Sequence, residues 1–179
     1  GNLEAVYSLI TSNSHHHFQF NNKPNKLNTY HQLFDVISEY ASCAIDTSDG
    51  VFNALLAIAE INQKGFILNH LPFLPLGLKV AKALDLSALL LFLGECGEYE
   101  ILFTVNAQDK ERLKAELSKR KIEAHELGMI VSQPFIKRVE HKRKIYDLKD
   151  YNIKARDYRN VHDYLNAMIQ SFVQLGKEK

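Results

Sequence analysis

Five consecutive residues, numbered 46–50, carry the side chains best suited to chemistry. They read Asp-Thr-Ser-Asp-Gly, so two carboxylates and a hydroxyl fall within four positions. A short apolar run at 43–45 precedes them and an almost wholly apolar segment at 51–61 follows, which predicts a turn between a strand and a buried helix. Carboxylate oxygens suit magnesium, and the first N–H groups of a helix favour a phosphate. Such a turn could hold the phosphates of a magnesium nucleotide.

The same residues allow a purely structural interpretation. Ser48 or Asp49 could accept hydrogen bonds from the first N–H groups of the helix, which stabilises a helix by ~1 kcal/mol. One such cap does not require Asp46 as well, and this favours the functional interpretation somewhat. At the level of the sequence both interpretations stay open.

A second candidate segment, at 94–100, reads Gly-Glu-Cys-Gly-Glu-Tyr-Glu and leads into the clearest predicted strand. Glycines let the backbone approach a ligand closely, and Glu95, Glu98 and Glu100 could accept hydrogen bonds from a substrate or bind a metal. Equally, a tight turn before a strand has this composition. We interpret Cys96 as a small buried hydrophobe rather than a nucleophile, because no histidine lies close to it in the sequence.

Hydrophobic periodicity predicts the elements that position these segments. We expect helices at 29–42, 51–61, 76–84, 86–92 and 109–121, and a last amphipathic helix at 161–175 that packs on a sheet or on a partner. We expect strands at 43–45, 66–68, 99–105, 124–131, 135–139 and 144–148. Alternating strands and helices predict one α+β domain over residues 1–179, with layered helices on a mixed β-sheet. Residues 1–28 form its variable leader and loop, and we interpret the histidines at 15–17 as exposed rather than as metal ligands.

Composition narrows the class of protein. The chain has 179 residues, 46% of them hydrophobic, which is enough for one substantial core. A formal charge of +1 gives no long-range attraction to nucleic acid or to an anionic membrane, so we expect neither as a partner. Two cysteines and the lack of a signal-peptide pattern predict a cytoplasmic protein. The apolar run at 84–93 is far shorter than the roughly 20 residues that cross a bilayer.

The two candidate segments together resemble motifs of the AIR synthase and thiamine-monophosphate kinase family. Residues 45–51, Ile-Asp-Thr-Ser-Asp-Gly-Val, are similar to the family's Ile-Asp-x-Ser-Asp-Gly-Leu. Residues 97–105, Gly-Glu-Tyr-Glu-Ile-Leu-Phe-Thr-Val, look like its Gly-Gly-Glu-Asp-Tyr-Glu-Leu-Leu-Phe-Thr-Val. The resemblance continues in order from about residue 33 to Leu-Gly-Met-Ile-Val at 127–131.

This resemblance implies the carboxy-terminal, partly ferredoxin-like domain of an enzyme that uses ATP and Mg²⁺. In the family an amino-terminal domain, which this chain does not contain, dimerises and supplies most of the ATP and metal ligands. Carried over by position, Asp46 and Asp49 would bind metal, and Ser48 and Gly50 would contact the nucleotide. The family's substrate-contacting glutamate falls at Gly97 without a gap and at Glu98 after a slip of one residue; we also assign substrate contact to Glu95.

The expected reaction is phosphoryl transfer from ATP to a small-molecule acceptor, with the full-length protein a homodimer and this chain inactive when isolated. The alternative is a non-catalytic binding or regulatory module that keeps the scaffold and has lost the substrate pocket. We do not find the family's aromatic ending, which helps to hold thiamine, so thiamine phosphate is not assigned as the acceptor. Lys154, Arg156 and Arg159, in the corresponding region, could hold an anionic substrate or be solvated.

Overall fold

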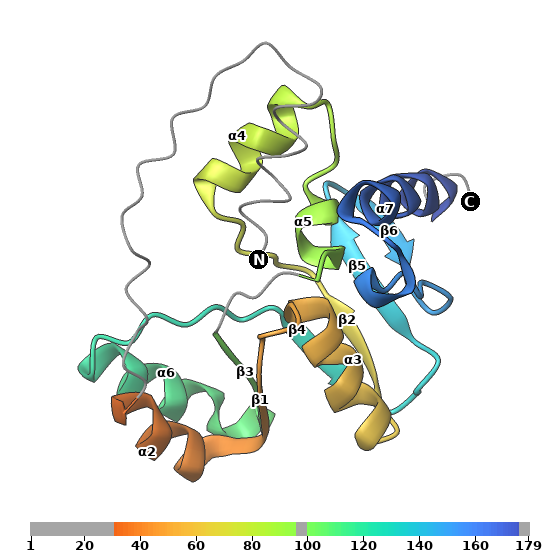
Figure 1. The fold of residues 1–179 in the computed structure, drawn as a ribbon. Coiled ribbons are helices and arrows are strands. Elements are labelled where there is room, and N and C mark those ends of the chain that lie inside the picture. The colour runs from red at the N-terminus through yellow and green to blue at the C-terminus, as the bar shows by residue number, and fades with distance from the viewer. Residues whose placement is uncertain (1–30, 96–99, 176–179) are drawn as a thin grey trace.

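A computed structural model describes residues 31–95 and 100–175 of the chain. In it, helices pack on a four-stranded mixed sheet and on a two-stranded antiparallel sheet (Figure 1). This is the α+β class, with layered helices on a mixed sheet, that the sequence predicts. Within the described ranges, no helix combines the length and the apolar character needed to span a membrane.

Each predicted helix and strand has a counterpart, with shifts at several bounds. The described helices are α2 (His31–Tyr40), α3 (Val51–Ile61), α4 (Pro75–Ala83), α5 (Leu89–Leu93), α6 (Lys110–Lys119) and α7 (Val161–Leu175). The described strands are β1 (Ala41–Asp46), β2 (Gly65–Leu68), β3 (Ile101–Val105), β4 (Gly128–Val131), β5 (Lys137–His141) and β6 (Lys144–Asp147). Two short 3-10 helices lie at Ala107–Asp109 and Ala155–Asp157.

The larger sheet has the strand order β4-β2-β5-β6 and carries the main core. Strand β2 runs parallel to β5, and the other two pairs are antiparallel. Phe66 and Leu68 of β2 and Val139 of β5 point to one face of the sheet and are buried there. Helices α3, α5 and α7 bury their apolar sides in the same cluster. The last helix therefore packs on the sheet, where Phe172 stacks on Tyr146.

The smaller sheet pairs β1 with β3 and has its own small core. Val36 of α2 meets the buried Leu113 and Leu117 of α6 there. On α6, Glu116 forms an ion pair with Arg120, with 2.6 Å between Oε1 and Nε. Because β1 leads through a short turn into α3, this sheet fixes where α3 begins.

Several predicted bounds were wrong, and in three cases a contact outside the element explains the difference. The helix predicted at 29–42 ends at Tyr40, because Ala41 pairs with Val105 in the smaller sheet. Strand β4 begins at Gly128 rather than at 124, and Glu126 of the preceding segment binds Lys110 instead. Helix α5 begins at Leu89 rather than at 86, since the chain before it closes the end of α4. The predicted start at Thr29 lies outside the described residues.

Candidate functional site

The turn between β1 and α3 is anchored by a threonine to which the sequence assigned no role. Thr47 is 1% exposed, and its N–H and hydroxyl both donate to the carbonyl oxygen of Glu100, over 2.9 and 3.2 Å. The N–H of Glu100 in turn donates to Thr47 Oγ1 over 2.9 Å. The turn is therefore fixed to the chain just before β3. No sequence pattern reveals this contact, because its partners are 53 residues apart.

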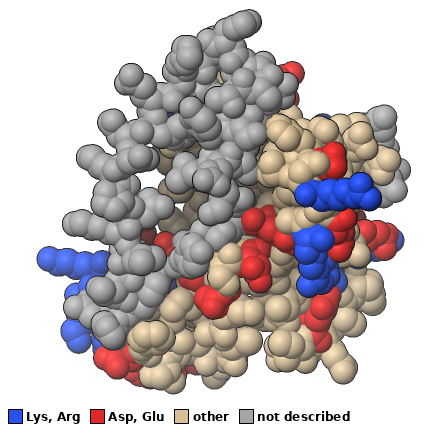
Figure 2. All heavy atoms as spheres, in the orientation of Figure 1, with Lys and Arg blue, Asp and Glu red and all other residues tan. Residues whose placement is uncertain are grey.

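Around this anchor the three polar side chains that the sequence singled out are exposed. Asp46, Ser48 and Asp49 all face solvent. The Asp46 carboxylate accepts hydrogen bonds from the Ser48 hydroxyl (2.7 Å) and the Ser48 N–H (3.2 Å). These two bonds, the hydroxyl first, hold the pKa of Asp46 below its usual range, so this carboxylate is charged at neutral pH. Figure 2 shows acidic side chains gathered in the middle of one face of the molecule.

Helix α3 begins without a side-chain cap. Its N-cap residue is Gly50, with φ 91° and ψ 154°, a conformation that glycine adopts at little cost. No side chain makes a capping hydrogen bond there, so the interpretation of Ser48 or Asp49 as a helix cap is wrong. The first helical hydrogen bond runs from the N–H of Ala54 to the carbonyl of Gly50, over 3.1 Å. The preceding N–H groups of the helix, those of residues 51–53, have no acceptor within the helix, as at helix starts that bind anions.

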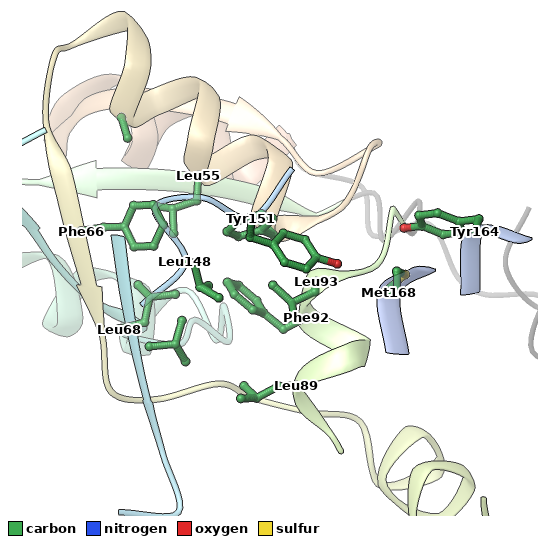
Figure 3. Packing of buried hydrophobic residues seen from close by; sticks show 13 residues of the cluster. Leu55, Phe66, Leu68, Leu89, Phe92, Leu93, Leu148, Tyr151, Tyr164 and Met168 are labelled. Atoms are coloured by element: carbon green, nitrogen blue, oxygen red, sulfur yellow. The ribbon is translucent and has the colours of Figure 1, made fainter. Parts of the chain in front are cut away.

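Glu95 lies beside this helix start and bonds within the protein. Its Oε1 accepts from Asn53 Nδ2 over 3.1 Å, and its Oε2 accepts from the N–H of Ala155 over 3.0 Å. Its own N–H donates to the Tyr164 hydroxyl over 2.9 Å, and Figure 3 shows that hydroxyl turned toward the chain that leaves α5. Contact of Glu95 with a substrate stays a prediction. Glu98 and Cys96 lie outside the described residues.

The cations predicted near an anionic substrate lie in the segment after β6, and two of them neighbour a residue that bonds Glu95. Ala155, which bonds Glu95, is flanked by the half-buried Lys154 and the exposed Arg156, and Arg159 is exposed as well. A hollow of about 310 Å³ lies elsewhere, lined by Arg138, Ile145, Asp147 and Leu175. None of the residues that we assign to the site lines that hollow.

The donor set suits a metal that arrives with its own ligands. Among the described residues, no group of three or more His, Cys, Asp or Glu side chains could hold a metal ion. Asp46 and Asp49 can therefore supply only part of a coordination shell. Magnesium in nucleotide sites is commonly held by one or two carboxylates together with substrate phosphates and water. The two carboxylates fit that arrangement rather than a metal site built from this chain alone.

Comparison with known proteins assigns no family to this chain. No protein-family model matches the chain, and no curated protein matches it. One solved structure that is similar is the protein tt0281 from Thermus thermophilus, with 22% sequence identity and a TM-score of 0.48. The similarity covers 58% of this chain and 33% of that one, so the chain matches about a third of that protein's length. At this level the likeness carries no argument about function.

Proposed function

We propose that the chain is the carboxy-terminal α+β domain of an ATP- and Mg²⁺-dependent phosphoryl-transfer enzyme of the AIR synthase and thiamine-monophosphate kinase type. There it helps to close the nucleotide and substrate site. The observation that supports this most is the uncapped start of α3 directly behind a turn with three exposed oxygen-bearing side chains, Asp46, Ser48 and Asp49. The resemblance of the two sequence motifs supplies the family.

Four of the five residues of the turn have a chemical role in this proposal. The first N–H groups of α3 and the helix dipole bind a phosphate, and Ser48 and Gly50 contact the nucleotide. Asp46 and Asp49 would hold the magnesium that accompanies the phosphates. Bound there, the metal would neutralise charge that develops during phosphoryl transfer, a reaction in which proteins act chiefly by positioning and electrostatics.

In this proposal, the remaining parts of the site lie outside the turn at 46–50. Glu95 and Glu98 would contact a small-molecule acceptor. An amino-terminal ATP-binding domain would supply most nucleotide and metal ligands, in a cytoplasmic homodimer. The isolated chain would then be inactive and would bind the metal nucleotide only weakly, at millimolar concentration, because two carboxylates seldom retain magnesium without further ligands.

A second candidate function is a binding or regulatory module without catalysis. It is favoured by the bond of 2.7 Å between the Ser48 hydroxyl and Asp46, which gives both groups a partner inside the turn. In this alternative the turn is a structural unit that has kept the scaffold of an enzyme.

Paramagnetic NMR on the ¹⁵N-labelled chain separates the two candidates. We expect millimolar ATP with Mn²⁺, which substitutes for Mg²⁺, to broaden the amide signals of residues 46–51. Asp46→Asn and Asp49→Asn should each weaken this effect about tenfold or more, since a bond to a charged group is worth ~1.5–3 kcal/mol. Asp147→Asn is the matched control, because Asp147 accepts an N–H from Lys149, two residues on, as Asp46 does from Ser48.

The pattern of NMR broadening in the wild-type chain and the variants decides between the enzyme domain and the non-catalytic module. Broadening at 46–51 that disappears in both turn variants and persists in the control supports the enzyme domain. Broadening that is absent from 46–51 in the wild-type chain, or unchanged by both turn substitutions, removes the basis for the proposal. ATP binding that needs no metal favours the non-catalytic module.

A further inference from the structure

Glu95 joins three segments that are far apart in the sequence. Its two carboxylate oxygens accept from Asn53 in the first turn of α3 and from the backbone of Ala155, 42 and 60 residues away. Its N–H bonds Tyr164 of α7, 69 residues away. The side chain is half-buried. Both of its oxygens therefore have donors from separate segments, which a glutamate that served only as a surface group would not need.

Asn53 carries the effect of Glu95 to the turn. Its side-chain nitrogen donates to Glu95 Oε1 and to the backbone carbonyl of Asp49, each over 3.1 Å. An amide NH₂ has two hydrogens, so both bonds form at once, and both partners are acceptors, which fixes the orientation of the amide. Glu95 thus holds the side chain of Asn53 in the orientation that reaches Asp49.

The Asp49–Gly50 peptide is the part of the turn that most needs such support. Its carbonyl accepts from Asn53, and its N–H, on Gly50, donates to the Thr47 carbonyl over 3.0 Å. Glycine at φ 91° has no side chain to restrict it, so these two hydrogen bonds must hold the conformation. The same peptide leads directly into the uncapped start of α3.

We infer that Glu95 is a positioning residue for the turn at 46–50, acting through Asn53. The chain of bonds runs from the Ala155 backbone through Glu95 and Asn53 to the Asp49 carbonyl. It sets the direction of the first N–H groups of α3 and of the two aspartates beside them. The consequence for ligand binding rests on the proposed function, whereas the consequence for the turn itself does not.

Hydrogen exchange without ligand tests the effect on the turn. Asn53→Ala removes the relay and leaves the charge of the site unchanged. It should accelerate exchange of the Gly50 N–H roughly three- to tenfold, the equivalent of one lost hydrogen bond. Asn62→Ala is the matched control, because Asn62 sits at the other end of α3 and also donates its side-chain amide to the carbonyl four residues earlier, over 2.8 Å. Equal exchange at Gly50 in the two variants overturns the inference.

Titration with Mn²⁺ and ATP then tests the effect on binding. Asn53→Ala should weaken binding several-fold while Asn62→Ala does not. Glu95→Gln gives a test of opposite sign: it removes a negative charge near a phosphate, so a purely electrostatic role predicts tighter binding. Positioning predicts weaker binding, because a glutamine cannot accept from Asn53 and Ala155 with both of its terminal atoms.

Failure of the inference and failure of the proposed function look different. If the Gly50 N–H responds to Asn53→Ala but the wild-type chain shows no broadening at 46–51, the positioning role stands and the phosphoryl-transfer proposal falls. If the wild-type chain binds and Asn53→Ala and Glu95→Gln bind as well or better, the positioning role falls and the proposal stands.

Discussion

Two tyrosines of the main core allow a sharp test of the packing described above. Tyr151 is 5% exposed and Tyr164 is 6% exposed, and both belong to the same cluster (Figure 3). The Tyr164 hydroxyl accepts a hydrogen bond from the N–H of Glu95, whereas the Tyr151 hydroxyl is buried without a hydrogen-bond partner among the described residues. The ring of Tyr151 packs edge-on against Phe52, with 5.5 Å between centroids. Phenylalanine at 151 would keep that ring and remove only the unpaired hydroxyl.

We therefore expect Tyr151→Phe to stabilise the protein and Tyr164→Phe to destabilise it. A buried polar group without a partner costs ~1–3 kcal/mol, and part of this returns when the hydroxyl is removed, so a gain of ~1 kcal/mol is expected. Tyr164→Phe leaves the partly buried N–H of Glu95 without this acceptor and should cost ~1–2 kcal/mol. In a chain of this length, 1 kcal/mol corresponds to about 2–4 °C in melting temperature.

Urea unfolding at neutral pH, followed by fluorescence or circular dichroism, measures both changes. The midpoint should rise for Tyr151→Phe and fall for Tyr164→Phe, with the slope unchanged. A loss in Tyr151→Phe as large as that in Tyr164→Phe would show that the Tyr151 hydroxyl has a partner, and would refute the reasoning.

The dependence of stability on alkaline pH gives a second test of the buried Tyr151. Burial, followed by the neighbouring Tyr164, Tyr158 and Glu95, raises the pKa of Tyr151 above its usual value. Above pH ~10 the unfolded chain has released this proton while the folded chain still holds it. Stability therefore falls as pH rises, by up to ~1.4 kcal/mol per pH unit from this group, and Tyr151→Phe should lose that part of the slope between pH ~9 and ~11.

Two further substitutions test the backbone. Lys142 and Arg143, at the tip of the hairpin between β5 and β6, have φ 49° and 64°. Replacing the pair by Asn-Gly, which such turns prefer, should stabilise the protein by ~1 kcal/mol in thermal melts. A loss of stability would contradict the strain assigned to the tip. A Cβ added at Gly65 would overlap the carbonyl oxygens of Gln133 and Ile136, so Gly65→Ala should destabilise by ~3 kcal/mol or more in urea unfolding.

The sequence predicted elements well where the signal is local. Helix α3 has the bounds that were expected, Val51–Ile61, because its apolar run lies between the turn at 46–50 and the chain reversal before Gly65. Predictions were less accurate where pairing with a distant strand decides the bounds. Ala41 can continue a helix as readily as it joins a strand, and its pairing with Val105 places it in β1.

In the candidate site, too, the sequence reveals the residues that are adjacent in the chain and not those that bond distant partners. Its polar residues, Asp46, Ser48 and Asp49, stand out because they follow one another in the chain. The supporting residues, Thr47 and Asn53, do not stand out: each bonds a group more than 40 residues away, and neither residue type is unusual in a turn or a helix. The substrate contacts that we assign to Glu95 from the sequence and to Glu98 from the resemblance stay predictions.

The parallel pairing of β2 with β5 has a consequence for folding during synthesis on the ribosome. Phe66 aligns with Lys137, yet α4, α5, β3, α6 and β4 all lie between the two strands in the sequence. Closing so long a segment costs entropy before any contact repays it. While the ribosome is still making the middle of the chain, Phe66 has no β5 beside it. The pairing of β2 with β5 in the larger sheet can therefore form only after most of the chain has been synthesised. Until then the apolar residues of this sheet depend on chaperones or on transient contacts for protection from water.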